Sequence, residues 1–352
     1  MEIQMEFGLW TPLPHVIRQE RRMEAALADL ERGDGAHGPD LAFEFAVDAI
    51  QRAEHFGFVS TLLAQRYLGP DLEAWTLAAA LAMKTKTIEL MVAVHPGIMT
   101  PQVVAKQAAS LDRVSQGRCA INIVNGHWVD EFNLFGNGTW IADPEARYRR
   151  MDEFIKVMRG LWTEPHLQIE GEYYQANLAC ALENKNQKVA VPEVGSIQVR
   201  PHRNHVPAIY AASRASSGKR VIAQHCDVWF AEYKPGYCNF EMNLEAIKRD
   251  VVDMTAVCTQ AGRKLRFGLN PLVVCEDTMA AATSAADWIE DPNNKDRISN
   301  SLGAGLVGTP KLIAERICRL QEAGIDNLML RFTPMEQGLE RFGQEVIPLL
   351  RG

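Results

Sequence analysis

The stretch that decides the fold runs from residue 88 to residue 124 and reads IELMVAVHPGIMTPQVVAKQAASLDRVSQGRCAINIV. Short apolar runs at 88–94 and 120–124 flank one longer segment, 101–117, whose pattern is typical of a helix. A strand, a helix and a second strand in this order form the unit in which a crossover helix joins two parallel strands. We therefore expect a parallel sheet that is covered by helices.

The same alternation repeats along the whole chain. Eight apolar runs alternate with helical stretches, which favours a closed α/β fold, the (β/α)8 TIM barrel, over an open doubly wound sheet. No G-x-G-x-x-G motif opens the first helix and no P-loop occurs, so an open nucleotide-binding sheet is further disfavoured. We expect one barrel domain over residues 1–352. The predicted strands are 7–10, 60–64, 88–94, 120–124, 207–213, 227–233, 266–274 and 326–332.

Three segments exceed ordinary connecting lengths and are predicted to be insertions in the barrel. They lie near 11–39, 165–205 and 291–308, and the second contains HLQIEGEYYQ, which indicates a small hairpin. A long loop that follows a barrel strand, as 11–39 does, would lie at the mouth where chemistry occurs. The other two segments follow helices, so their position is left open.

Composition excludes several classes of protein. The chain has 352 residues, a net charge of −7 and no basic run with interleaved aromatic residues, so we expect no nucleic-acid partner. The N-terminus shows no secretory pattern and no stretch is apolar enough to span a bilayer. Seven scattered cysteines without a C-x-x-C pair are typical of reduced thiols, and we expect a cytoplasmic protein.

A polar residue interrupts one predicted strand, and more polar residues follow its end. Asn122 stands in the apolar run AINIV, where a strand that is buried on both faces should read as continuously apolar. Its amide needs a partner, either a neighbouring strand or the polar edge of a bound ring. His127 and Trp128 would stand at the rim of the barrel, although loop packing also explains Trp128. Glu131 begins a helical turn, where a carboxylate is favourable for dipole reasons alone.

Two segments have the composition of an anion site. Arg147 and Tyr148 lie near the start of a predicted helix and could bind a phosphate, or they could form an ordinary solvated basic face. Ser213 and Arg214 follow the fifth strand, in the turn AASRASSGKR that leads into a helix. Free backbone N–H groups at such a turn favour anions, whereas simple N-capping by a serine is the plainer interpretation.

The remaining motifs supply little catalytic equipment. His202 and His205 have no cysteine or paired carboxylates nearby in the sequence, so we expect no metal site. No G-x-S-x-G motif occurs, and no Ser–His–Asp arrangement can be read from the sequence. This lack of acid–base groups suggests that a cofactor performs the chemistry.

Four stretches together carry a family resemblance that spans nearly the whole chain. The chain resembles the bacterial luciferase-like superfamily of flavin-dependent monooxygenases, in its alkanesulfonate and dimethyl-sulfone branch. Each stretch alone is a weak signal, but together they are specific. They are VAVHPGIMTPQVVAKQAASLDRVSQGRCAINIVNG (92–126), ARYRRMDEFIKVMRGLW (146–162), LVGTPKLIAERI (306–317) and FGQEVIPLL (342–350).

The resemblance implies a cofactor, partners and an oligomer. Members of this superfamily fold as a (β/α) barrel with insertions and use reduced FMN, which a separate NAD(P)H:flavin reductase delivers, together with dioxygen. They oxygenate a small substrate and often cleave a carbon–sulfur bond. Relatives form homodimers or homotetramers, and the same is expected here.

The resemblance also assigns roles to individual residues. It implies that Asn122 and Glu131 contact the flavin. Gln65 or Arg66, at the end of the second strand, would contact the flavin ring or its oxygen adduct and are candidates for catalysis. Arg147 and Tyr148 would hold the phosphate together with the turn from Ser213 to Gly218. The remaining candidates for catalysis are His127, Trp128 and Asn270.

Departures from the family pattern bear on the substrate. The stretch FGLNPLVV places Asn270 and Leu272 where alkanesulfonate enzymes carry Arg-x-His, and the loop RYLGPDLEAW lacks an expected cysteine. An Asn and a Leu are poorly suited to desolvate a full negative charge, so a small neutral substrate such as a sulfone is favoured. The family's phosphate turn GGSS reads ASRA here, and Arg214 could take over part of that contact.

Other functions remain open at this point. The chain could be an alkanesulfonate desulfonase or a ring-opening oxygenase of the pyrimidine type. The same fold also hosts deazaflavin-dependent reductases, and a barrel that binds flavin without catalysis belongs to a different class altogether.

Overall fold

The structure is a computed structural model that describes residues 5–17, 20–32, 40–126, 128–177, 199–234, 236–291 and 301–351. In this part of the chain, eight parallel strands pair in sequence and close on themselves, because the last of them, β12, pairs with β1. The prediction of a closed (β/α)8 barrel is confirmed. The barrel strands are β1 Glu6–Trp10, β2 Ser60–Leu63, β3 Glu89–Val94, β4 Cys119–Ile123, β7 Ala208–Ala212, β8 Val228–Phe230, β9 Arg266–Leu269 and β12 Asn327–Phe332.

The seventh predicted strand differs from the prediction, because it breaks in two. β9 ends at Leu269, and a separate strand, β10 Leu272–Cys275, continues along β12 and pairs with the short β11 Val307–Gly308. Pro271 lies at the break and has no N–H group to donate to a ladder. Its carbonyl still accepts from the Arg331 backbone N–H at 2.9 Å.

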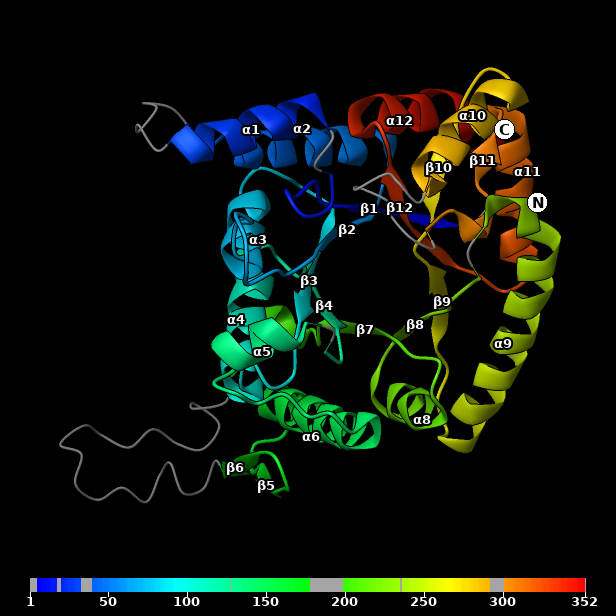
Figure 1. The fold of residues 1–352 in the computed structure, drawn as a ribbon. Helices are drawn as coiled ribbons and strands as arrows, with labels where there is room; N and C mark the ends of the chain where they lie inside the picture. Colours follow the sequence, from blue (N-terminus) through cyan, green and yellow to red (C-terminus); the bar gives the residue numbers. More distant parts are fainter. Residues whose placement is uncertain are drawn as a thin grey trace.

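Helices surround the barrel, as Figure 1 shows. The described helices of the main repeat are α2 Leu41–Phe56, α3 Ala74–Ala82, α4 Pro101–Val114, α6 Pro144–Thr163, α8 Ser216–His225, α9 Phe240–Gln260, α10 Met279–Glu290 and α11 Pro310–Glu322. The chain ends in α12 Met335–Arg341, a π-helical turn Phe342–Val346 and α13 Ile347–Arg351. Short 3₁₀ turns occupy His202–Asn204, Tyr237–Asn239 and Ser301–Ala304.

Three of these helices begin at the same local signal. Each has proline as its first residue, and the side chain of the preceding Thr100, Asp143 or Thr309 accepts a backbone N–H of the first turn. Proline suits this position because its missing N–H would be unpaired there anyway. The capping oxygen satisfies one of the other free amides. The helix starts are therefore fixed by local sequence.

The insertions carry their own elements. The first contains α1 Arg21–Arg32, which packs beside α2 (Figure 1). The predicted hairpin of the second is confirmed as β5 Gln168–Glu170 and β6 Gln175–Asn177, and Glu153 holds its turn by accepting three backbone N–H groups. Most of its remainder, 178–198, and residues 292–300 of the third insertion lie outside the described residues.

The barrel interior follows from the alternation of side chains along each strand. In β4, Ala120 packs inside the barrel with Leu62, Met91 and Tyr210, whereas Cys119, Ile121 and Ile123 pack outside against the helices. Because successive residues of a strand face opposite sides, Asn122 faces inward, one layer above Ala120 toward the carboxyl ends of the strands. In the described part of the chain no helix has the length and apolar character needed to cross a membrane.

Candidate active site

The carboxyl ends of the strands bring four polar or aromatic residues to one mouth. Asn122 and Arg331 each stand two residues beyond an inward-facing residue of their strand, Ala120 and Met329, so each faces the barrel axis. Asn270 follows the end of β9 and accepts a hydrogen bond from Trp10. Trp10 packs directly on the inner cluster, and Asn122 is partly exposed with Ala93 and Tyr210 as its strand partners. The mouth of a closed barrel is where such side chains converge.

One edge of the mouth is closed by a carboxylate clamp. Glu131 lies in the short helix α5 Val129–Leu134 after β4, and its side chain is buried. Its Oε1 receives Arg66 Nε at 2.8 Å and the backbone N–H groups of Tyr67 and Leu68 at 3.2 and 3.3 Å. The Arg66 guanidinium also lies 3.9 Å above the Trp128 ring. The clamp thus ties the loops after β2 and β4 together.

Gln65 forms two hydrogen bonds within the loop after β2. Its Oε1 accepts the backbone N–H of Ala74 at 2.8 Å, and its Nε2 donates to the Arg66 carbonyl at 2.9 Å. Both ends of the amide therefore have protein partners, and the side chain is buried.

Burial and the nearby carboxylates of Glu73 and Glu131 raise the pKa of Tyr67 above its ordinary value.

A neutral cradle forms where β7 leads into α8. The Tyr148 hydroxyl on α6 and the Ser213 hydroxyl lie 2.7 Å apart, and Ser213 Oγ also accepts the Ala215 N–H at 3.1 Å. Gly218 packs against both, because a Cβ there would overlap Ser213 Oγ and the Tyr148 ring. Ala215 caps α8 without a side-chain hydrogen bond, so the first-turn amides face this cradle without a local cap.

The two predicted phosphate arginines have protein partners. Arg147 donates to the carbonyls of Ile141 and Ala142 at 2.8 and 3.1 Å, and its guanidinium lies 4.8 Å from the Trp140 ring. Arg214 is mostly exposed and pairs with Glu232. A ligand would therefore have to share Arg214 with Glu232.

The opposite side of the mouth is built from three strands that are distant in sequence. The Arg331 guanidinium carbon lies 3.3 Å from the centre of the Trp10 ring, and Trp10 Nε1 donates to Asn270 Oδ1 at 3.4 Å. The Tyr233 hydroxyl donates to the Asn270 carbonyl at 2.5 Å. Burial lowers the pKa of Arg331 to about 10, against an opposing contribution from Tyr233, so the guanidinium stays charged at neutral pH.

Comparison with known proteins identifies the family. The family model described as luciferase-like monooxygenase matches residues 23–327, most of the chain. The chain belongs to the luciferase-like monooxygenase family. A relative from Pseudomonas putida, an FMNH(2)-dependent dimethylsulfone monooxygenase, is 27% identical over 338 residues, which cover 86% of each chain. A protein of the same name from Pseudomonas fluorescens is 25% identical and covers 89% of this chain and 88% of its own.

Among solved structures, the fold is similar to EDTA monooxygenase from Chelativorans sp. BNC1. The TM-score is 0.71 and the identity 21%, with 98% of this chain and 93% of that chain covered. This likeness concerns the fold. The recognised resemblance to luciferase-like monooxygenases and the monooxygenase class are thus confirmed, while the roles of single residues stay predictions.

The structure of this luciferase-like chain brings five of the predicted site residues into contact, Arg66, Trp128 and Glu131 in one group and Tyr148 and Ser213 in another. Asn122 and Asn270 face the mouth, and Tyr148 meets Ser213 beside it. His127 lies outside the described residues. Leu272 does not face the mouth, because β10 turns it under α10, where it is fully buried. Its identity therefore bears on packing rather than on the substrate.

Sequence reasoning missed three residues of this region. Tyr233 and Arg331 lie at the ends of two apolar strands predicted from the sequence, 227–233 and 326–332. The signal available for Arg331 was the two-residue alternation of its strand, which makes it face inward. His15, in the loop after β1, pairs through Nδ1 with the buried Asp71 carboxylate at 2.6 Å, a contact between two loops that no local pattern indicates. Within the described ranges, no group of three His, Cys, Asp or Glu side chains is placed to hold a metal ion.

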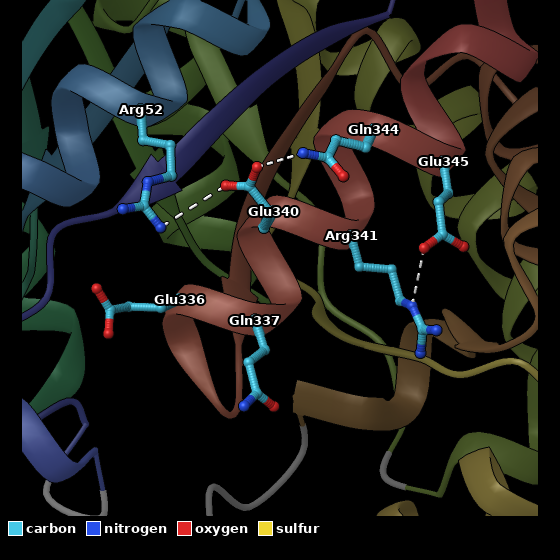
Figure 2. Close-up of a pocket in the computed structure, with 7 residues that line it drawn as sticks. All are labelled: Arg52, Glu336, Gln337, Glu340, Arg341, Gln344 and Glu345. Carbon is cyan, nitrogen blue, oxygen red and sulfur yellow. Dashed lines mark hydrogen bonds and ion pairs between the residues drawn. The ribbon is translucent and has the colours of Figure 1, made fainter.

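A surface hollow of about 430 Å³ lies outside the barrel, on α12 and the π-helical turn beside α2 (Figure 2). Its polar groups largely satisfy one another. Arg341 pairs with Glu345 at 3.1 Å, Arg52 with Glu340 at 3.6 Å, and Gln344 also donates to Glu340. The pairing of these groups with one another explains the charge content of the hollow.

Proposed function

We propose that this luciferase-like monooxygenase uses reduced FMN and dioxygen to oxygenate a small organosulfur compound, with a neutral sulfone as the first candidate. The observation that carries the cofactor assignment is the cradle of Tyr148, Ser213 and Gly218 at the start of α8. The family and the two Pseudomonas relatives, named as FMNH(2)-dependent enzymes, support the same cofactor.

The residues present fit the two ends of FMN. Hydroxyl donors and first-turn amides suit a phosphate, and Gly218 lets the Ser213 and Tyr148 side chains approach the start of α8 closely. The Ser217 hydroxyl is engaged by Glu145 at 2.8 Å, so Tyr148 and Ser213 carry the side-chain part of the contact. At the other end, the partly exposed Asn122 offers a donor and an acceptor to the polar edge of the ring.

The chain's own residues would bind and orient the reactants. Reduced FMN, when bound, supplies the two electrons that convert one atom of dioxygen to water while the other enters the substrate. The buried clamp of Arg66 and Glu131 keeps the rim of the mouth in place and limits the entry of water. Asn270, held by Trp10, presents its amide Nδ2 toward the mouth as a neutral donor.

The substrate class rests on the relatives and on Asn270. The Pseudomonas putida relative is named for dimethylsulfone, at an identity that leaves the substrate of this chain to experiment. Asn270 at the end of β9 is neutral, which suits an uncharged polar group such as a sulfone. A separate flavin reductase would supply the reduced cofactor, and a homodimer or homotetramer in the cytoplasm stays a prediction.

A coupled assay tests this function. The purified protein is mixed with FMN, an NADH:flavin reductase, dioxygen and dimethyl sulfone. One turnover should consume one dioxygen and yield methanesulfinate, formaldehyde and water, with FMNH2 oxidised to FMN. The panel also contains alkanesulfonates and a pyrimidine, which separate the alternative oxygenases.

Two controls separate the remaining alternatives. Anaerobic turnover with a reduced deazaflavin would indicate hydride transfer and contradict the oxygenase proposal. The double variant Tyr148→Phe, Ser213→Ala should bind FMN at least about tenfold more weakly, because it removes two hydroxyl partners of the phosphate. Unchanged FMN affinity would contradict the cradle, and flavin binding without oxygen-dependent product would indicate a non-catalytic barrel.

A further inference from the structure

Arg331 is a charged group at the mouth, and the described residues supply no counter-charge to it. Its guanidinium carbon lies 3.3 Å from the centre of the Trp10 ring, and its Nε is buried without a hydrogen-bond partner among the described residues. None of the described carboxylates pairs with it. The other arginines near the mouth differ, since Arg66 pairs with Glu131 and Arg214 pairs with Glu232.

A partly buried charge whose Nε is shielded from water is costly unless a partner supplies acceptors. Stacking on an aromatic ring stabilises the face of a guanidinium but leaves the N–H groups in its plane unpaired. Those in-plane donors match two oxygen atoms on one centre, which is the geometry of a sulfonyl, sulfonate or carboxylate group. The unmet donors of Arg331 therefore indicate a ligand with paired oxygens.

The surroundings of Arg331 are apolar. A narrow crevice beside it, too tight in this structure to hold a water molecule, is lined by Trp10, Val16, Ile17, Phe332 and Met335. None of these described wall residues carries a carboxylate. Asn270 uses its Oδ1 to accept from Trp10, so its Nδ2 remains as a second, neutral donor on the same side. A charged donor, a neutral donor and short apolar walls suit a small molecule with two oxygens and alkyl substituents.

We propose that Arg331 is the substrate-recognition residue, and that it reads the paired oxygens of an R–SO₂ group whose alkyl part packs on Val16, Ile17, Phe332 and Met335. This inference rests on the proposed function and deepens it. The R–SO₂ group is common to sulfones and to sulfonates, and the charge of Arg331 supports binding of both. The positive charge of this site comes from Arg331 on β12. The end of β9 supplies only the neutral side chain of Asn270.

The test compares Arg331→Met with Arg331→Lys on two substrates of equal size. Dissociation constants for dimethyl sulfone and methanesulfonate are measured by calorimetry on the FMN-loaded protein, FMN affinity by fluorescence, and KM and kcat in the coupled assay. Arg331→Met should weaken binding of both compounds about tenfold or more, mainly in KM, with FMN affinity within about twofold of wild type. Arg331→Lys keeps the charge but loses the planar fork, so it should retain methanesulfonate better than dimethyl sulfone.

The outcomes separate the two proposals. Arg52→Met, on the outer hollow, is the matched control and should change none of these values. If the wild-type protein oxygenates sulfonyl compounds and Arg331→Met binds them normally, this inference is overturned while the proposed function stands. Equal loss of FMN and substrate binding in both Arg331 variants would also overturn it, because Arg331 would then support the fold. If the wild-type protein neither binds nor oxygenates any sulfonyl compound, both proposals fail.

Discussion

Glu131 and Arg66 form a 2.8 Å ion pair that joins the helix after β4 to the loop after β2. The carboxylate is buried and also holds two backbone amides of that loop, so one side chain organises a whole edge of the barrel mouth. Family resemblance assigns Glu131 to the flavin. The contacts indicate that it also shapes the rim that a flavin would meet.

Replacing this carboxylate with an amide tests the clamp. We expect Glu131→Gln to lower the free energy of unfolding by about 1–3 kcal/mol, because the ion pair with Arg66 and the charge-assisted hydrogen bonds from the Tyr67 and Leu68 amides are lost in a buried site. Urea denaturation followed by circular dichroism measures the change. The matched control is Glu340→Gln, whose half-exposed pair with Arg52 should contribute less than about 1 kcal/mol. Equal effects in the two variants would contradict a special role for the clamp.

The cradle at α8 makes a steric prediction. Gly218→Ala places a Cβ against Ser213 Oγ and the Tyr148 ring, so it should separate the two hydroxyls and cost about 1–3 kcal/mol of stability. FMN titration should show a larger loss than the stability change alone explains. Ser284→Ala, at an exposed serine of α10, is the control, and it should leave both measurements near wild type. FMN binding by Gly218→Ala at wild-type affinity would exclude this turn as the phosphate site.

The two candidate phosphate arginines should behave differently. Arg214→Ala should weaken binding of reduced FMN by about 1–3 kcal/mol if a charge-assisted phosphate contact is lost, because Arg214 lies exposed beside the cradle and shares only Glu232. Arg147→Ala should lower thermal stability as well, since it removes the donors to two loop carbonyls. Anaerobic titration with reduced FMN and thermal unfolding measure the two effects. Wild-type flavin affinity in both variants would remove the arginines from the phosphate site.

Stability should depend on pH through Glu54 at the end of α2. Burial alone would raise the pKa of this carboxyl, but backbone N–H groups of Thr87, Ile88 and Lys86 outweigh it and hold the pKa below 4.5. A carboxyl whose pKa is lower in the folded state stabilises the fold at pH values above its unfolded-state pKa. This stabilisation is lost as the pH falls through the folded-state pKa. Wild-type protein should therefore lose stability below about pH 4.5. Glu54→Gln should be less stable at pH 7 and show a flatter profile in urea unfolding across pH 3–7; a parallel profile would contradict this role.

Much of the fold was predictable because its signals are local. The T-P and D-P pairs at Thr100, Asp143 and Thr309 set three helix starts through caps that involve only neighbouring residues. The inward direction of Asn122 followed from the two-residue period of β4. The break of the seventh strand could have been inferred from Pro271, which cannot donate to a ladder. Its consequence for Leu272 required the position of α10.

The sequence by itself indicated the closed barrel, the starts of three helices and the inward direction of residues such as Asn122, since these depend on periodicity, capping and the alternation of strands and helices along the chain. Only the tertiary structure decided which of those residues meet. Closure of the sheet places β12 beside β1 and sets Arg331 on Trp10, while Gln65 and Arg147 turn to backbone partners nearby. Such contacts depend on the three-dimensional path of the loops. They also depend on which carbonyl, carboxylate or ring lies within reach of each donor, and no local sequence pattern specifies this.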